Sequence, residues 1–150
     1  MRCVIQRVSK CSVTIEGKLH SSIDKGLLIL VGIEDADTDQ DIGWLVGKII
    51  NMRIFDDENG VMNKSVMEVS GSLMVVSQFT LMAQTKKGNR PSYIKASKPE
   101  FSRPMYEQFC NTMEKLSGIT VQKGIFGADM KVGLVNDGPV TILMDSKNKE

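Results

Sequence analysis

Runs of apolar residues mark the strands of a buried sheet. Residues 27–33 and 73–76 are almost wholly apolar. Such runs leave no face for solvent, so both predict strands that are covered on two sides. Residues 3–15 alternate in their second half, with apolar side chains at odd positions and polar ones at even positions. This spacing predicts one long strand with a single solvent face, and Arg7 places a cation on its apolar side.

Two segments carry the 3.6-residue spacing of amphipathic helices. The first is expected to be capped by Asp37 or Thr38, and the second to begin near Pro99 or Pro104 and to end at Gly118. The expected core stripes are Ile42, Leu45, Val46, Ile49 and Ile50 in the first helix, and Tyr106, Phe109, Cys110 and Met113 in the second.

The remaining elements are short strands that do not alternate regularly with helices. They are expected at 19–23, 119–121, 130–135 and 140–144, with a turn at 136–139 and a polar tail at 145–150 that frays. The chain has 150 residues, a length that fits one domain. We therefore expect an α+β fold, a single domain spanning 1–150 with a mostly antiparallel or mixed, barrel-like sheet and two main helices.

The second buried strand ends in polar side chains. Ser77, Gln78 and Thr80 follow the apolar run directly, and a strand continuing to residue 81 would put Ser77 and Phe79 on one side and the other two on the opposite side. Two hydroxyls and an amide at the end of a core strand need hydrogen-bond partners. Neighbouring backbone is one candidate partner, and a ligand is the other.

The net charge of the whole chain does not indicate a nucleic-acid partner. The net charge is +1 with 25% charged residues, so any signal of this kind must be local. Residues 86–103 carry six basic residues against one acid. Lys86, Lys87 and Arg90 are therefore candidate phosphate contacts, because lysine and arginine neutralise phosphates without reading sequence. A solvated basic loop is the alternative.

The composition excludes several kinds of site. His20 is the only histidine, so one chain cannot supply a Ser-His-Asp or Cys-His site or a multi-histidine metal centre. The three cysteines, Cys3, Cys11 and Cys110, show no CxxC spacing. We expect no metal and no cofactor. The apolar runs are too short to cross a bilayer and the first residues lack a signal-peptide layout, so a cytoplasmic protein without a membrane partner is expected.

The remaining chemistry is limited to activated substrates. Thr80 has no base nearby in the sequence, whereas backbone N–H groups at the strand end, with Ser77 or Gln78, could form an oxyanion hole. Such a site suffices for a substrate that brings its own assisting group, such as an aminoacyl ester on a ribose with a neighbouring hydroxyl. Gly138–Pro139 could present a rigid pair of carbonyls to an amino group, or could form an ordinary turn.

Several segments together closely resemble the D-aminoacyl-tRNA deacylases. The matching pieces are Ser-Gln-Phe-Thr-Leu at 77–81, Lys-Gly-Asn-Arg-Pro-Ser at 87–92, Phe-Gly-Ala-Asp-Met at 126–130, Asn-Asp-Gly-Pro-Val-Thr at 136–141 and the opening residues 1–8. The resemblance spans nearly the whole chain. It implies a homodimer that acts on aminoacyl-tRNA and hydrolyses the ester bond of D-aminoacyl-tRNA and of mischarged glycyl-tRNA.

The resemblance also implies roles for individual residues. The base of the pocket would be Ser77, Gln78, Phe79 and Thr80, and Phe126 and Met130 would lie beside the terminal adenosine. Gly138 and Pro139, joined by a cis bond, would enter from the partner subunit, hold the amino group and exclude L side chains. Arg7 would brace this Gly-Pro loop. Asn89 and Tyr93 differ from residues that are common in the family, so the tRNA contacts of their loop stay open.

Three alternatives accompany this interpretation. The first is a non-catalytic nucleic-acid-binding module that uses the basic loop at 86–103. The second is the sister deacylase family of relaxed chirality, in which the proline that matches Pro139 is trans. The third concerns mechanism alone, with Thr80 as a covalent nucleophile in place of backbone N–H groups around Phe79 and Thr80.

Overall fold

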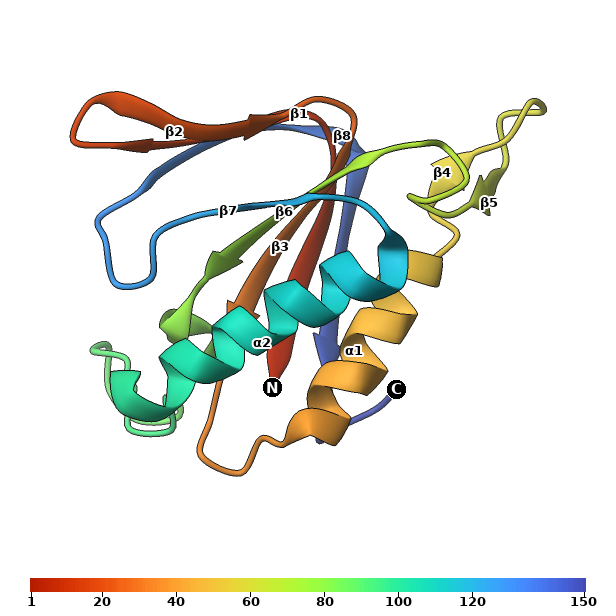
Figure 1. Ribbon diagram of the computed structural model, residues 1–150. Helices are drawn as coiled ribbons and strands as arrows, with labels where there is room; N and C mark the ends of the chain where they lie inside the picture. The colour runs from red at the N-terminus through yellow and green to blue at the C-terminus, as the bar shows by residue number, and fades with distance from the viewer.

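The computed structural model describes residues 1–150 and places two helices on one face of a six-stranded mixed sheet (Figure 1). The sheet contains β1 (Arg2–Ile15), β2 (Lys18–Ile23), β3 (Gly26–Gly32), β6 (Ser72–Ser77), β7 (Val121–Lys123) and β8 (Lys131–Asp145). A small hairpin of β4 (Phe55–Asp56) and β5 (Met62–Lys64) projects from one end. The helices are α1 (Asp39–Asn51), α2 (Pro99–Ser117) and the 3-10 turn η1 (Phe79–Met82). The predicted α+β class is confirmed.

Strand β1 is the centre of the sheet. It pairs antiparallel with β3 and β2 on one edge and with β8 on the other, while β3, β6 and β7 are parallel neighbours. The strand order is β2-β1-β3-β6-β7, and the sheet curls so that its first and last strands meet. At this contact Ser21 Oγ on β2 donates a 2.9 Å hydrogen bond to the carbonyl of Lys123 on β7. The sheet therefore nearly closes into a barrel.

The curl creates two apolar cores. The larger core lies between the sheet and the helices and includes Leu73 and Val75, whereas the smaller core lies inside the curl and includes Met74 and Val76. Side chains alternate along a strand, so β6 supplies both cores from its two faces. The prediction that this strand has no solvent face is confirmed for residues 73–76.

The expectation for the first strand is corrected by a bulge. Cys3 and Ile5 face the larger core, but Cys11 and Val13, also at odd positions, face the smaller core inside the curl. The register between β1 and β8 shifts after Val8, and one extra residue turns every following side chain to the other face. The regular alternation read from residues 3–15 therefore does not describe a single face.

Both predicted helices are confirmed, as are the residues expected at their ends. Thr38 is the N-cap of α1, and the Asp41 carboxylate accepts hydrogen bonds from the N–H and the hydroxyl of Thr38 at 2.8 and 3.0 Å. Helix α2 begins at Pro99, which needs no N–H partner at a first position, and Pro104 lies inside the helix. Gly118 ends it in the left-handed conformation.

The turn expected at 136–139 is wrong. Strand β8 runs without reversal from Lys131 to Asp145, and both of its halves pair antiparallel with β1. Asn136 lies opposite Val8 and Thr141 lies opposite Gln6. The four residues of β8 between them therefore lie opposite a single residue of β1, Arg7. The chain therefore forms a wide bulge at this point, which carries Gly138 and Pro139 out of the sheet.

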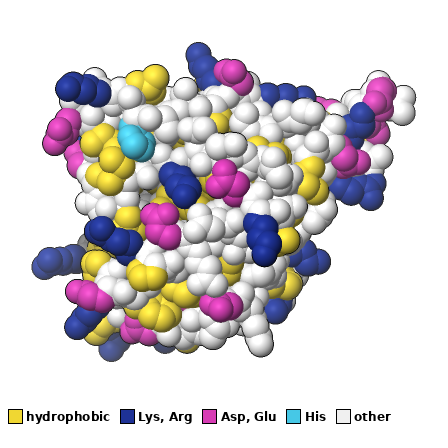
Figure 2. All heavy atoms as spheres, viewed as in Figure 1, with side chains coloured by type: hydrophobic (Ala, Val, Ile, Leu, Met, Phe, Trp, Pro, Cys, Tyr) yellow, Lys and Arg dark blue, Asp and Glu magenta, His cyan; other side chains and the backbone are white.

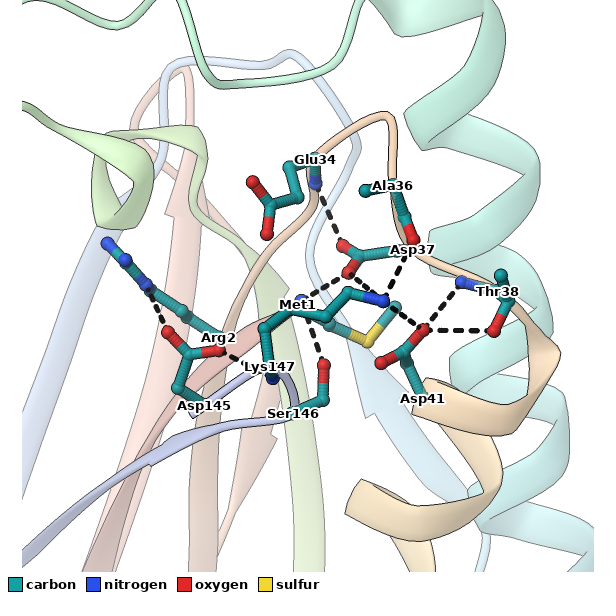
Figure 3. A network of polar contacts seen from close by, with 10 residues as sticks. All are labelled: Met1, Arg2, Glu34, Ala36, Asp37, Thr38, Asp41, Asp145, Ser146 and Lys147. Carbon is teal, nitrogen blue, oxygen red and sulfur yellow. Dashed lines mark hydrogen bonds and ion pairs between the residues drawn. The ribbon is translucent and has the colours of Figure 1, made fainter. Parts of the chain in front are cut away.

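A polar network fastens the two ends of the chain beside α1 (Figure 3). The buried amino group of Met1 pairs with Asp37 and donates a 3.0 Å hydrogen bond to Ser146 Oγ. Lys147 Nζ donates to the Asp41 carboxylate at 2.8 Å. The expectation that the tail frays is therefore wrong for its first residues, because their side chains find partners on α1 and at the chain start.

Charged side chains of both signs are spread over the face drawn in Figure 2, without a single dominant basic field. This distribution agrees with the net charge of +1. A phosphate site on this molecule must therefore be a local cluster of cations. Neither helix is long and apolar enough to cross a bilayer.

Candidate functional site

The end of β6 differs from the predicted strand to residue 81. The last ladder bond is donated by the Gln78 N–H to the carbonyl of Val31 at 2.7 Å, and the chain then turns into η1. Gly32 makes room for this turn, because a Cβ there would lie 2.8 Å from Leu81 Cβ and 3.0 Å from the Gln78 oxygen. Phe79 and Thr80 are thus part of a tight turn packed on the end of β3, and the expected alternation of sides does not apply.

The turn leaves two of its own backbone donors without an internal acceptor. The Leu81 N–H bonds to the Gln78 carbonyl at 3.2 Å, whereas the N–H groups of Phe79 and Thr80, the first two residues of η1, have no acceptor within the turn. The first N–H groups of any helical turn lack internal acceptors. Two adjacent donors of this kind on a fixed backbone are the arrangement that an oxyanion requires.

The Thr80 hydroxyl is held by its neighbour. Gln78 Nε2 donates to Thr80 Oγ1 at 2.6 Å. This contact gives the hydroxyl a donor, and no histidine, lysine or carboxylate is hydrogen-bonded to it as a base. This hydrogen bond joins two side chains of the turn and restrains the segment that carries the N–H groups of Phe79 and Thr80.

A pocket of about 670 Å³ lies beside this turn. Ser77, Gln78 and Phe79 line it together with Phe126 and Met130, so the structure brings five of the predicted site residues into one cavity. Further lining comes from the end of β3, the segment before α2 and the start of α2, at Val31, Ile33, Tyr93, Ala96, Ser97, Lys98, Pro99 and Ser102. Thr80 is next to the pocket but not among its lining residues.

Met130 and Phe126 are positioned by close packing. A Cβ at Gly124 would lie 2.5 Å from Met130 Sδ, so only glycine lets the thioether occupy this place. The ring of Phe126 lies 6.0 Å from that of Tyr106, and the Arg103 guanidinium lies 5.3 Å over it. Tyr106 is fixed in turn by a 2.8 Å bond from its hydroxyl to the Val75 carbonyl. Burial raises the pKa of Tyr106, so it stays a neutral donor.

Residues 93–102, part of the basic segment at 86–103, form one wall of the pocket. Tyr93 packs edge-on against Phe79 with ring centroids 5.2 Å apart. The Ser97 N–H bonds to the Ile33 carbonyl at 3.0 Å, which ties this segment to the end of β3. Ser97 Oγ is the one buried side-chain oxygen without a hydrogen-bond partner. No motif surrounds Ser97, so only the fold reveals its place.

Gly138 and Pro139 lie outside this pocket within one chain. Their peptide bond is cis, the isomer that the family resemblance implies. Arg7 donates to the Asp137 carbonyl at 2.9 Å and to the Ile54 carbonyl at 2.7 Å, and so ties the bulge to the base of the β4–β5 hairpin. A Cβ at Gly138, whose φ is +134°, would lie 2.7 Å from Val140 Cγ2.

The basic residues chosen from sequence are not at the pocket. Lys86, Lys87 and Arg90 lie in an exposed segment between Gln84 and Ser92, which form an isolated β-bridge, and none of the three lines the cavity. Any contact that they make with a phosphate lies beyond the pocket. Lys98, another cation of the basic segment at 86–103, does line it.

The thiols offer no nucleophile. Burial raises the pKa of Cys110 to about 12 and also raises the pKa values of Cys3 and Cys11. These groups are therefore protonated thiols at neutral pH. His20 is exposed on β2. No group of three histidine, cysteine or acidic side chains is placed to hold a metal ion. The pocket offers backbone donors, hydroxyls and an amide.

Comparisons with known proteins identify the relatives of this chain. The family model described as D-Tyr-tRNA(Tyr) deacylase matches residues 4–145. The D-aminoacyl-tRNA deacylases of Flavobacterium johnsoniae and Bacteroides thetaiotaomicron are 69% and 65% identical to this chain, with all of each chain covered.

Solved structures give the same fold. One titled c-Myc DNA Unwinding Element Binding Protein is 39% identical, with a TM-score of 0.91 over 97% of this chain and 98% of that chain. Another, titled as a probable eukaryotic D-amino acid tRNA deacylase, is 17% identical, with a TM-score of 0.82 over 95% and 97%, and supports the fold alone.

Proposed function

Because this chain belongs to the D-Tyr-tRNA(Tyr) deacylase family, we propose that it hydrolyses D-aminoacyl-tRNA. The bond cleaved is the ester between the amino acid and the terminal ribose, and the products are free tRNA and a D-amino acid. Mischarged glycyl-tRNA is a second substrate. The observation that carries this proposal is the pair of N–H groups of Phe79 and Thr80, which have no acceptor within the η1 turn, beside a pocket of suitable size.

The mechanism is electrostatic. The two N–H groups donate to the ester carbonyl oxygen and stabilise the negative charge that develops on it as water attacks. The ribose 2′-hydroxyl of the substrate assists the water, because the chain places no base beside the turn. Thr80 stays bonded to Gln78 and positions the backbone. Phe126 and Met130 pack against the terminal adenosine.

Selection against L-amino acids is proposed to come from a second subunit. Gly138 and Pro139 of one subunit enter the pocket of the other, and their carbonyls accept the substrate's amino group. An L side chain would then collide with them, whereas a D side chain points away and glycine has none. The brace from Arg7 and the exposed position of the bulge on β8 support this role.

The surface around β8 supports a dimer. Leu143 is 69% exposed on β8, and Val4 on the neighbouring β1 and Leu30 on β3, the next strand along, are only half-buried. Val4 lies opposite Leu143 in the β1–β8 pairing and opposite Leu30 in the β1–β3 pairing, so the three side chains share one sheet face. The neighbouring Cys3 and Ile5 point the other way, into the larger core. An apolar sheet face of this kind is usually buried against a partner. A second copy would cover it and bring the Gly-Pro bulge near a foreign pocket.

The function is tested by incubating the protein with D-tyrosyl-tRNA and L-tyrosyl-tRNA and measuring the release of tyrosine. We expect rapid release from the D-ester and release from the L-ester at the uncatalysed rate. Release from neither would overturn the proposed enzyme activity. Equal release from both would overturn the chiral filter and favour the sister family of relaxed chirality.

A non-catalytic nucleic-acid-binding module is the second candidate function. The 39% identical solved structure titled as a DNA unwinding element binding protein favours it. This candidate predicts salt-dependent binding of nucleic acid without cleavage of either ester. The same incubation therefore separates the two candidates, provided that binding of tRNA is measured in parallel.

A further inference from the structure

Two cations stand at the start of α2 where the pocket opens. Lys98, the N-cap of the helix, lines the pocket, and Arg103 lies one turn further along with its guanidinium 5.3 Å over the ring of Phe126. Phe126 itself lines the pocket. Lys98 is thus part of the pocket wall, and Arg103 contacts an aromatic residue of that wall.

Neither cation has a partner in the chain. The side chains of Lys98 and Arg103 form no ion pair and no hydrogen bond, although Glu100 lies between them in the sequence. By contrast, Arg2 and Arg7 are each paired with a carboxylate. Unpaired cations beside a pocket raise its affinity for anions.

Arg103 is held with its donors free. A guanidinium over an aromatic face is attracted by the ring's electron density, and this contact uses none of its five N–H donors. The ring is in turn fixed against Tyr106, at a centroid distance of 6.0 Å. The planar fork therefore has a defined place and remains able to make a bidentate contact with a phosphate.

We propose that Lys98 and Arg103 bind the phosphodiester groups of the last nucleotides at the 3′ end of the RNA substrate. This inference rests on the proposed function, which places the terminal nucleoside between the η1 turn and Phe126. The phosphate on the 5′ side of that nucleoside then leaves the pocket along the start of α2. Lys86, Lys87 and Arg90 do not line the pocket, so they meet more distant parts of the RNA.

The test compares two substrates with the same ester. One is D-tyrosyl-tRNA, and the other is 3′-O-(D-tyrosyl)adenosine, which has no phosphate. Lys98→Gln and Arg103→Gln are expected to raise KM for the tRNA about fivefold each, with kcat changed less than about twofold, because the lost contact is remote from the reacting bond. Cleavage of the nucleoside ester should fall less than cleavage of the tRNA ester in both variants, because the nucleoside has no phosphate contact to lose. Arg103→Lys should be intermediate, because it keeps the charge and loses the fork.

Lys115→Gln is the matched control. Lys115 is an exposed cation in the last turn of α2, so the variant loses the same charge at the far end of the same helix. Its KM for the tRNA should equal that of the unmodified protein. Binding of deacylated tRNA is measured alongside over a range of salt concentrations. Each loss at Lys98 or Arg103 should lower the slope of log affinity against log salt by about 1.

Each of three results would overturn the inference. The first is an equal rise in KM for the nucleoside ester and for the tRNA, and the second is a rise in KM for Lys115→Gln as large as that for Arg103→Gln. The third is an unchanged slope of log affinity against log salt. If the unmodified protein cleaves neither ester, the proposed function fails. The salt dependence of tRNA binding then still decides whether the two cations contact phosphates.

Discussion

At the scale of single residues, absent side chains shape the site as much as present ones. Gly32 allows the η1 turn to pack on β3, Gly124 leaves space for Met130, and Gly138 lets the bulge of β8 pass close to Val140. In each place a Cβ would come within 3 Å of a neighbouring atom. The present positions of η1, Met130 and the bulge therefore depend on the absence of a Cβ at these three glycines.

Gly32→Ala should damage the platform directly. The new Cβ would lie 2.8 Å from Leu81 Cβ, so η1 must move and the N–H groups of Phe79 and Thr80 move with it. We expect a loss of about 1–3 kcal/mol in the free energy of unfolding. Urea unfolding measures the stability, and kcat for D-tyrosyl-tRNA should fall even where the variant is fully folded.

Gly43→Ala is the control for this change. Gly43 lies inside α1, and a Cβ there meets nothing within 4 Å. The substitution should stabilise the protein by about 1 kcal/mol through helix propensity and leave kcat unchanged. If Gly32→Ala keeps full activity when folded, the position of η1 is not what catalysis depends on.

Gly138→Ala addresses selectivity. The residue has a φ of +134°, and its Cβ would lie 3.2 Å from the Arg7 guanidinium, so the bulge must shift. We expect the ratio of D- to L-tyrosyl-tRNA hydrolysis to fall at least tenfold, a change of about 1.4 kcal/mol in discrimination. Single-turnover rates on both esters provide the ratio. An unchanged ratio together with a displaced bulge would exclude Gly138 from the filter.

At the scale of elements, the charged carboxylate of Asp41 anchors the start of α1. Burial by itself would raise the pKa of Asp41, but hydrogen bonds from Lys147 and Thr38 outweigh it and hold this pKa well below the usual range (Figure 3). The folded state thus binds this proton less tightly than the unfolded state. The stability that Asp41 contributes is present above about pH 4 and is lost as the pH falls below that value.

Asp41→Asn should reveal this contribution. At pH 7 the variant should lose about 1–3 kcal/mol in the free energy of unfolding, since hydrogen bonds to a charged group are lost. The difference from the unmodified protein should shrink toward pH 2. Urea unfolding across this range measures it. Asp39→Asn, at an exposed position in the same helical turn, should cost less than about 1 kcal/mol. Parallel pH profiles for the Asp41 variant and the unmodified protein would contradict the account.

The elements that could be predicted are those with a clear pattern of apolar residues along the sequence. The apolar runs at 27–33 and 73–76 and the stripes of both helices follow from burial alone. The η1 turn and the bulge in β8 could not be predicted, because they depend on contacts with Gly32 and Arg7, which lie far away in the sequence. The site motifs were found by resemblance. The wall around Ser97 has no motif, and a hydrogen bond to Ile33 places it.

At the scale of the whole molecule, the predicted site residues of one chain lie in two separate places. The η1 turn and the pocket lie in one part of the chain, and Gly138 and Pro139 project from β8 outside that pocket. In the proposed function, a partner subunit brings its own Gly138 and Pro139 to this pocket. The exposed apolar side chains beside the bulge supply the contact area that such a partner needs.

Leu143→Glu tests this assembly. The charge would be buried if a second copy covers β8, so we expect a monomer by light scattering and a large loss of D-tyrosyl-tRNA hydrolysis. Leu19→Glu is the matched control, since Leu19 is 66% exposed against 69% for Leu143 but lies on β2. It should stay dimeric and active. A monomeric Leu143→Glu protein with full activity and selectivity would show that one chain suffices.

The central claim is that backbone N–H groups and the substrate's own hydroxyl perform the reaction, with Thr80 as support. Single-turnover hydrolysis of D-tyrosyl-tRNA by the Thr80→Ala protein, compared with hydrolysis of a 2′-deoxy terminal adenosine substrate by the unmodified protein, tests it most directly. The account predicts that Thr80→Ala keeps its rate within about tenfold and that the 2′-deoxy substrate loses at least about a hundredfold. Loss of the reaction in Thr80→Ala, with normal cleavage of the 2′-deoxy substrate, would contradict it and make Thr80 the nucleophile.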